Sequence, residues 1–197
     1  DIHARTASEV FGVPIDSVTG EQRRRAKAVN FGIVYGLSDF GLARDLGISR
    51  KEAAGYIECY FARYHGVREF LDKTVANAHA SGYVTTLYGR RRDLPALRSR
   101  NFMQRSFAER MAMNTPIQGT AADLIKIAMI RAYDALCAAN VQSRILLQVH
   151  DELVLEVAEA EVEAVTEILR TAMSGAAELL VPLAVDVHIG KNWAEAK

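Results

Sequence analysis

Residues 145–157 read ILLQVHDELVLEV, and this stretch decides the fold class. An apolar run of 13 residues is too long for one typical strand, since about 5–6 residues is usual. Its only polar cluster is His150-Asp151-Glu152, so we predict a β-hairpin that turns at these residues. No Asn-Gly or Asp-Gly pair marks the turn, which leaves its type and the strand register open.

The segments around the hairpin indicate an α+β fold. Residues 159–180 have the spacing of an amphipathic helix, and VPLAVDVHIG at 181–190 reads as a last strand. Helix signals dominate the chain before the hairpin. We therefore expect a helical first part, followed by an antiparallel β-hairpin and a C-terminal strand that are covered by helices.

Capping residues mark the upstream helices. Three Ser/Thr-x-x-Glu/Gln capping boxes occur, namely Thr19 with Gln22, Ser49 with Glu52, and Ser106 with Glu109. Three glycines stand where helices would end, namely Gly36, Gly47 and Gly66. These signals predict helices near residues 20–35, 39–46, 50–65 and 67–80.

A second β-like segment, YVTTLY at 83–88, follows these helices and precedes a turn, GRRRDLP, at 89–95. Another helix is expected to start at Phe107. Pro116 and Gly119 should bend or break this helix before it resumes to about Ala139.

Composition excludes several classes of protein. The chain has 197 residues, half of them apolar, which is enough for one core or two small lobes. No secretory signal is visible in DIHARTASEV, and no apolar run approaches the about 20 residues of a membrane span. Cys59 and Cys137 match no metal or redox spacing, which indicates plain thiols in a reducing compartment.

Charge is balanced overall but unevenly distributed. Residues 21–110 carry 17 Lys/Arg against 9 Asp/Glu, whereas residues 111–197 carry 6 against 12. A basic part beside an acidic part suits a protein that binds a polyanion on one surface and cations on another. The alternative is that these charges lie on solvated faces that bind no ligand.

The most specific pattern lies in EQRRRAKAVNFGIVYG at 21–36. Four side chains spaced by four residues share one helix face: Arg23, Lys27, Phe31 and Tyr35. The two cations lie near a helix N-terminus, which favours anions, so they suit a triphosphate, and the two aromatic rings suit a sugar and a base. An exposed basic helix with two buried aromatic side chains is the alternative. Gly32 argues against this alternative, because a glycine inside a helix costs about 1 kcal/mol, and the close approach of a ligand or of another backbone is a good reason to accept that cost.

Five blocks together resemble the DNA polymerases of family A, the bacterial DNA polymerase I type. They are RRRAKAVNFGIVYG at 23–36, LLQVHDELVLEV at 146–157, ERMAMNTPIQGTAADLIKIAM at 109–129, DIHARTAS at 1–8 and YGRRRDLP at 88–95. The resemblance runs in order from Asp1 to NWAEAK. It implies a fingers subdomain at 1–80 with a nucleotide-binding helix at 20–35. It also implies a distal palm subdomain at 81–197 with the catalytic hairpin at 145–157.

The resemblance assigns the nucleotide site. Arg23 and Lys27 would hold the phosphates of the incoming dNTP, and Lys27 would also serve catalysis. His3 would assist near the phosphates. Phe31 would stack on the sugar and base, where phenylalanine goes with discrimination against dideoxynucleotides. Tyr35 would lie beside the templating base.

The resemblance also assigns DNA and metal contacts. Residues that would bind the primer–template are Arg24, Arg110, Asn114, Gln118 and His150. The spacing of Arg110, Asn114 and Gln118 itself predicts one helix face, which suits a minor groove. Asp151 would be a Mg²⁺ ligand and Glu152 an auxiliary acid. Two Mg²⁺ ions are expected, with the second carboxylate ligand outside this chain. Alone, the tripeptide at 150–152 reads equally well as a hydrophilic turn.

A DYS-Q-IE-R motif, which carries the family's other palm aspartate, is not in this chain. We therefore expect the upstream palm, the thumb and any exonuclease domain to lie outside it, and we expect the isolated chain to be inactive. Its expected partners are primer–template DNA, dNTP and the rest of the polymerase, with no membrane. The expected location is the bacterial cytoplasm, associated with the nucleoid.

Two other interpretations stay open. GLARDLGISRKEAAGYIE at 41–58 resembles a helix-turn-helix with Gly47 in the turn, which would make the protein a non-catalytic DNA-binding module. The second interpretation is a non-catalytic relative that keeps the fold only as a DNA clamp.

Overall fold

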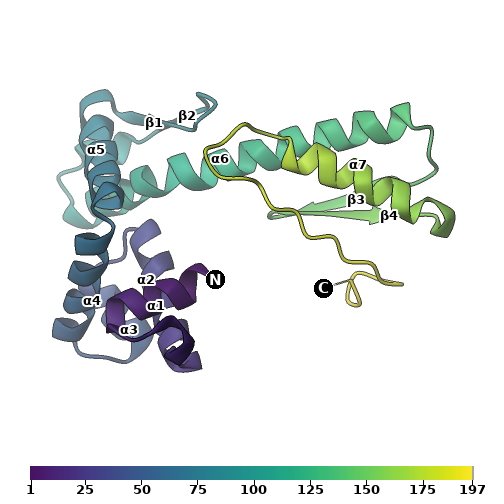
Figure 1. The fold of residues 1–197 in the computed structure, drawn as a ribbon. Helices are drawn as coiled ribbons and strands as arrows, with labels where there is room; N and C mark the ends of the chain where they lie inside the picture. Colours follow the sequence, from purple (N-terminus) through teal and green to yellow (C-terminus); the bar gives the residue numbers. More distant parts are fainter. Residues whose placement is uncertain (197) are drawn as a thin grey trace. The chain divides into compact units, whose positions relative to one another are not determined.

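The computed structural model describes residues 1–196, which divide into two compact units (Figure 1). The first unit covers residues 1–117 and the second begins at Gln118. The boundary falls within a helix of 37 residues, α6 (Phe102–Ala138). Within residues 1–196, no helix combines the length and the apolar character that crossing a membrane requires.

The first unit is mainly helical. Its elements before α6 are α1 (Ile2–Phe11), η1 (Ile15–Ser17), α2 (Gly20–Val34), α3 (Asp39–Leu46), α4 (Arg50–Arg63), α5 (His65–Ser81), β1 (Tyr83–Thr85), β2 (Arg91–Asp93) and η2 (Pro95–Arg98). The helices predicted near 20–35, 39–46, 50–65 and 67–80 are confirmed as α2 to α5. The sequence reading did not predict α1, although Asp1 caps its start and Gly12 its end.

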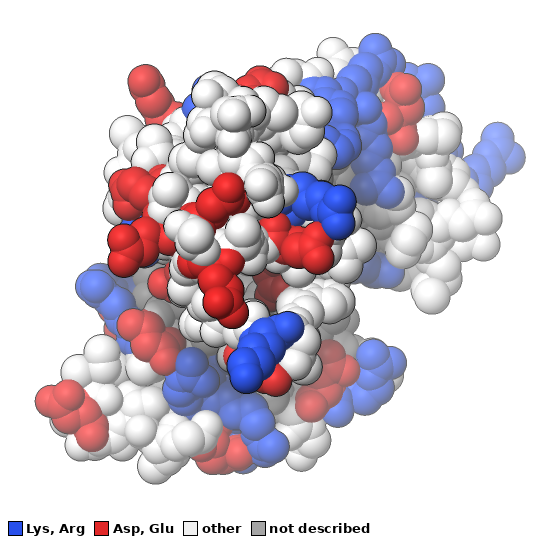
Figure 2. All heavy atoms as spheres, turned by 90° about the vertical axis from the view of Figure 1, so that its right-hand side faces the viewer, with Lys and Arg blue, Asp and Glu red and all other residues white. Residues whose placement is uncertain are grey.

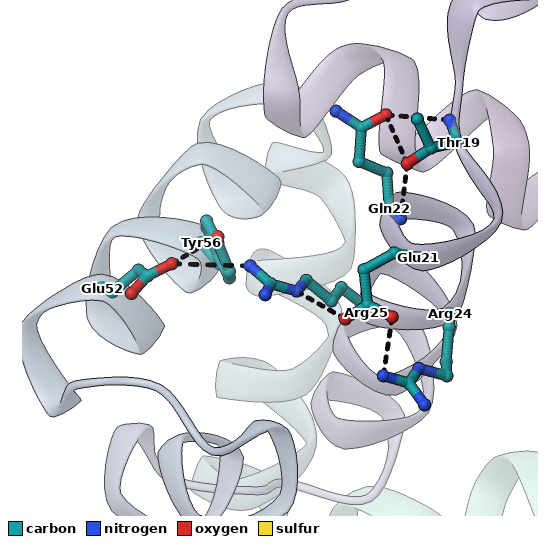
Figure 3. Close-up of polar contacts among 7 residues, drawn as sticks. All are labelled: Thr19, Glu21, Gln22, Arg24, Arg25, Glu52 and Tyr56. Atoms are coloured by element: carbon teal, nitrogen blue, oxygen red, sulfur yellow. Dashed lines mark hydrogen bonds and ion pairs between the residues drawn. The ribbon is translucent and has the colours of Figure 1, made fainter.

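Buried apolar side chains of α2 to α5 form the core of the helical part. The core residues are Val29, Ile33, Leu42, Ala43, Ala53, Tyr60 and Leu71. The capping box at the start of α2 is confirmed, because Thr19 Oγ1 accepts from the Gln22 N–H at 3.2 Å and Gln22 Oε1 accepts from the Thr19 N–H at 2.9 Å (Figure 3). The capping box therefore fixes the residue at which α2 starts, and with it the side chains of α2 that face the core.

A polar network joins α2 to α4 beside this core. Arg25 Nε lies 3.0 Å from Glu21 Oε1, and Arg25 Nη1 lies 3.7 Å from Glu52 Oε1 (Figure 3). Tyr56 donates its hydroxyl proton to the same Glu52 oxygen at 2.8 Å. The network fixes the rotation of α2 against α4, so the side of α2 away from the core keeps a constant orientation.

Two predicted helix ends are confirmed and one is wrong. Gly36 and Gly47 have φ of 65°, the left-handed conformation that ends a helix. Gly66 lies inside α5, because α4 ends at Arg63 and α5 begins at His65 without a loop.

The β-like segment at 83–88 is shorter than predicted, since β1 ends at Thr85. Strand β2 lies within the predicted turn and pairs antiparallel with β1, Tyr83 opposite Asp93. The turn itself is therefore residues 86–90. The guanidinium carbon of Arg91 lies 3.9 Å from the ring centroid of Tyr83, a contact that orders the hairpin.

Helix α6 begins earlier than predicted. Asn101 Oδ1 accepts from the Met103 N–H at 2.9 Å, so Asn101 caps the helix and the start at Phe107 is wrong. Ser106 and Glu109 lie inside α6, where Glu109 contacts His79 Nε2 at 2.9 Å. Pro116 and Gly119 do not break α6, because a proline removes one backbone hydrogen bond and the neighbouring turns of a long helix are kept.

The second unit contains the predicted hairpin. Strands β3 (Arg144–Val149) and β4 (Glu152–Glu156) pair antiparallel around a two-residue turn, His150-Asp151, with Val149 opposite Glu152. The register shifts between Ile145 and Leu147. The core beneath the hairpin consists of Ala132, Leu136, Val165, Leu169 and Ala172, with Ile145, Leu153 and Leu155 packed against it.

The last part of the chain differs from the prediction in two ways. The helix expected at 159–180 is a 3-10 turn, η3 (Glu159–Glu161), followed by α7 (Val162–Ser174). Residues 181–190 do not form the expected strand. Leu183, Val185 and Val187 are half-buried and alternate with exposed neighbours, as in a strand. A strand needs a partner for its backbone groups, and no described segment pairs with this one.

Glu161 fixes the connection between α6 and β3. Its carboxylate accepts from the backbone N–H groups of Gln142 and Ser143, each at 3.0 Å, and from the Ser143 hydroxyl at 2.6 Å. The hydrogen bonds from the Ser143 side chain and the Gln142 backbone lower the pKa of the Glu161 carboxyl. The ionised carboxylate therefore stabilises this connection.

We expect Glu161→Gln to lower the thermal unfolding temperature of the chain at neutral pH. Because folding lowers the pKa of Glu161, its ionised form stabilises the fold above the ordinary value of 4.5, and this contribution is lost as the pH falls through the lower folded-state pKa. The difference between parent and variant should therefore shrink in acid. Glu159→Gln, in the same turn, is the control. A difference of equal size at neutral and acidic pH would contradict the role of the charge.

Candidate functional site

The exposed face of α2 carries the predicted row of side chains. Arg23, Lys27, Phe31 and Tyr35 are exposed, whereas Ala26, Val29 and Ile33 on the other side are buried. The rings of Phe31 and Tyr35 are stacked, with centroids 6.1 Å apart and planes at 11°. Lys27 Nζ lies 5.8 Å from the Phe31 ring centroid. The alternative of two buried aromatic side chains is thus excluded, since 44% of Phe31 and 40% of Tyr35 is exposed.

Helix α1 adds His3 to this face. The His3 and Phe31 ring centroids are 5.7 Å apart. Burial and the cations Arg23 and Lys27 lower the pKa of the His3 imidazole. A neutral imidazole, two cations and two aromatic rings therefore lie together in the first unit.

The two cations of this face differ in their partners. Arg23 Nε lies 2.6 Å from Asp1 Oδ2. Lys27 has no carboxylate partner among residues 1–196. An anion that binds this face therefore meets an unneutralised ammonium group at Lys27 and must compete with Asp1 at Arg23.

Two neighbouring residues lie elsewhere. Arg24 is not one of the residues in the row, and its Nη2 pairs with Glu21 Oε2 at 2.6 Å (Figure 3). Gly32 lies on the buried side of α2, where an added Cβ would be 3.5 Å from Leu37 Cβ and 3.7 Å from Leu42 Cδ1. The expectation that Gly32 marks the close approach of a ligand is wrong, because the residue packs against two leucine side chains.

Helix α6 carries the three predicted DNA contacts. Arg110 donates to Ser106 Oγ at 3.1 Å, and its guanidinium carbon lies 5.8 Å from the ring centroid of Phe107. Asn114 is half-buried, and within residues 1–196 its Oδ1 is a buried acceptor with no hydrogen-bond partner. Gln118 is exposed and opens the second unit.

The tip of the β3–β4 hairpin presents three exposed polar side chains, those of His150, Asp151 and Glu152. His150 has φ of 52°, an uncommon left-handed conformation for a residue other than glycine. Gln148 Nε2 donates to the His150 carbonyl oxygen at 2.7 Å and so holds the turn. Two antiparallel strands thus fix the backbone that carries Asp151.

The hairpin tip fits part of a metal site. Adjacent carboxylates offer the hard oxygen donors that Mg²⁺ prefers. However, residues 1–196 contain no group of three or more His, Cys, Asp or Glu side chains that could hold a metal ion. The donor chemistry therefore suits a divalent cation, and the number of donors suits a site completed by other residues.

The structure adds two residues that the sequence reading missed. Asp1 binds Arg23, and Asn30 Nδ2 lies 3.0 Å from His3 Nδ1. Asn30 has one sequence signal, a polar side chain directly beside the apolar stripe of α2. Its partner His3 belongs to another helix, α1, so the spacing of residues within α2 could not reveal this contact.

The second unit is acidic. From Gln118 onward the sequence has 6 Lys/Arg against 12 Asp/Glu, and acidic side chains are numerous on the side of the molecule shown in Figure 2. Residues 1–117 have 18 against 12. The uneven charge of the sequence thus follows the two units.

Comparisons with known proteins agree with these features. A family model described as DNA polymerase family A matches residues 1–195. The chain is 54% identical over 196 residues to a DNA polymerase I of Pseudomonas aeruginosa, and 55% identical over 197 residues to one of Geobacillus stearothermophilus. It is also similar to a solved structure, the POL domain of Pol1 from M. smegmatis in complex with DNA primer-template and dNTP. That match has 50% identity and a TM-score of 0.96, and it covers all of this chain and 35% of the other.

Both curated relatives are matched over the whole of this chain and over 22% of their own length. The chain therefore spans less than a quarter of each. Because the family model covers nearly every residue, and because the relatives are more than half identical to it, this chain belongs to DNA polymerase family A.

Proposed function

We propose that this chain is the C-terminal part of a template-directed DNA polymerase. The polymerase transfers a nucleotidyl group from a dNTP to the 3′-hydroxyl of a primer in DNA replication and repair. The exposed face of α2, where His3 joins Arg23, Lys27, Phe31 and Tyr35, is the observation that carries this proposal. The complete polymerase is the longer chain that contains this sequence, with residues 1–80 as fingers and 81–197 as distal palm.

The chemistry of this face matches a nucleoside triphosphate. Lys27 and Arg23 attract the phosphates, and His3 adds a neutral donor beside them. The exposed rings of Phe31 and Tyr35 offer flat surfaces to the sugar and the bases. In nucleotidyl transfer the protein mainly positions groups and neutralises charge, which is what these side chains provide.

Other residues are proposed to bind DNA. Arg110, Asn114 and Gln118 on α6 would contact the primer–template. Arg24 and His150 are exposed and would contact DNA at other points. The M. smegmatis relative was solved with primer-template and dNTP, which supports the same ligands here.

Asp151 is proposed to hold Mg²⁺, with Glu152 as an auxiliary acid and a second carboxylate from outside this chain. When bound, two such ions activate the attacking oxygen and stabilise the leaving one. The contribution of this chain is positional, because the hairpin holds the Asp151 carboxylate at a rigid tip. The proposed place of action is the bacterial nucleoid.

We expect the 197-residue chain alone to show negligible primer extension, because its residues supply only part of a metal site. The complete polymerase should extend the same primer with the same dNTPs and Mg²⁺. Extension by the short chain at a rate comparable to the complete polymerase would contradict this prediction. Failure of the complete polymerase to extend the primer would contradict the proposed function itself.

A second candidate is a non-catalytic DNA-binding module. Helices α3 and α4 are joined at Gly47 as in a helix-turn-helix, which favours this candidate. It gives no role to the α2 face. Binding to one duplex sequence that is unaffected by dNTP and Mg²⁺ would support it over the polymerase.

A further inference from the structure

Polar contacts lead from His3 to Asn30 and Thr6, and a second polar cluster lies around Glu9 in the same unit. Helix α1 contributes His3, Thr6 and Glu9, spaced by three residues and therefore close on one side of the helix. Asn30 on α2 lies between the first two, with Nδ2 3.0 Å from His3 Nδ1 and 3.1 Å from Thr6 Oγ1. Tyr64, between α4 and α5, donates its hydroxyl proton to Glu9.

Charged side chains surround the Glu9 carboxylate. Glu9 is only 19% exposed and lies beside the guanidinium groups of Arg63 and Arg5, at 3.3 and 3.5 Å. The hydrogen bond from Tyr64, and then the contacts with Arg63, lower the pKa of the Glu9 carboxyl. An ionised carboxylate only accepts hydrogen bonds, so Tyr64 must be the donor in this pair.

Asn30 connects Thr6 to the imidazole of His3. The Thr6 hydroxyl lies within hydrogen-bond distance of Asn30, with its Oγ1 3.1 Å from Asn30 Nδ2. Thr6 is 1% exposed, so water does not replace Asn30 as its partner. Its oxygen then accepts from the Asn30 amide group. The second amide hydrogen of Asn30 is left for His3 Nδ1.

We propose that Asn30 is a positioning residue that holds the neutral imidazole of His3 with Nδ1 as acceptor and the proton on Nε2. The Nε2–H group then donates a hydrogen bond to a phosphate oxygen of the incoming nucleotide. This inference rests on the proposed function, in which His3 lies beside the phosphates, and it adds the residue that fixes the ring orientation and tautomer.

The charges around His3 agree with a neutral donor. Arg23 and Lys27 face it from α2. The Asp1 carboxylate is bound to Arg23 and accepts from the His3 backbone N–H. Further protonation of the ring is thus disfavoured, and a neutral ring has only one N–H to donate. Which nitrogen carries that proton decides whether a phosphate meets a donor or a lone pair.

The first test is a double-mutant cycle in the complete polymerase, measured as KM and kcat for single-nucleotide extension. His3→Ala should raise the KM for dNTP about tenfold, and Asn30→Ala about fivefold, with smaller changes in kcat. The double variant should resemble His3→Ala alone, because Asn30 acts through the imidazole. If the fold increases in KM of the two single variants multiply in the double variant, the two residues act independently, and the inference is wrong.

The second test is a pH profile of Asn30→Asp, a substitution of the same size that keeps the fold if Asn30→Ala loses it. A carboxylate accepts a proton from Nδ1, so the neutral ring would turn a lone pair toward the phosphate. The dNTP KM of this variant should therefore rise as the pH increases through the pKa of its His3, and by more than that of the parent, whose neutral ring still donates from Nε2. Parallel profiles would overturn the assignment.

The two tests separate this inference from the proposed function. If His3→Ala leaves the KM for dNTP unchanged, the proposed phosphate role of His3 is wrong, and the inference falls with it. If His3→Ala weakens dNTP use but both Asn30 variants match the parent, only the inference is wrong.

Discussion

Asp151→Ala in the complete polymerase should reduce the rate of nucleotide addition by a factor of about 10³ or more, while DNA affinity stays close to that of the parent. Charge neutralisation by a metal ion contributes several kcal/mol to such a reaction, and about 1.4 kcal/mol corresponds to a tenfold change in rate. Asp151 lies at an exposed hairpin tip and supports no core contact, so the variant should keep its fold.

The measurement is single-turnover extension of a labelled primer, with DNA binding measured separately by fluorescence anisotropy. Glu178→Ala, an exposed acid in the same unit, is the control and should leave both quantities unchanged. Substantial residual turnover by Asp151→Ala would mean that other residues hold the metal ions. A parallel loss of DNA affinity would instead indicate that the hairpin itself had changed.

Lys27→Ala should weaken dNTP use by a factor of about 10–100 and leave DNA affinity within a few-fold of the parent. A hydrogen bond to a charged group is worth about 1.5–3 kcal/mol, and Lys27 has no carboxylate partner within residues 1–196 that competes for its ammonium group. Arg23→Ala should have a smaller effect, because Asp1 already neutralises part of the Arg23 charge in the free protein.

The readout is the dNTP concentration dependence of the single-turnover rate. Lys51→Ala, which removes an exposed lysine from α4, tests whether any loss of positive charge produces the same effect. Equal dNTP affinity in Lys27→Ala and parent would remove Lys27 from the phosphate role. Equal losses in Lys27→Ala and Lys51→Ala would indicate a general electrostatic effect of the surface.

Local signals in the sequence predicted much of the fold. The box of Thr19 and Gln22, the glycines Gly36 and Gly47 and the polar interruption at 150–152 act within one element, so they can be read from neighbouring residues. The common face of Arg23, Lys27, Phe31 and Tyr35 followed from the helix period alone.

The errors concern partners that lie far away in the sequence. Residues 181–190 alternate like a strand, but a strand forms only where a second segment supplies its hydrogen bonds. Gly32 was read as a ligand contact because the sequence does not show Leu37 and Leu42 packed against it. Asn30 was missed because its role depends on His3 and Thr6, which come from another helix.

The separation of α2 into a buried face and an exposed face also affects which substitutions the protein can accept. The side chains that give α2 its place in the fold are Ala26, Val29 and Ile33, and none of them is on the exposed row. Under the proposed function, substitutions at Phe31 or Tyr35 would alter nucleotide preference while the buried side of α2 stays intact. A helix built in this way leaves room for natural variation, or for engineering of nucleotide selectivity, one exposed position at a time.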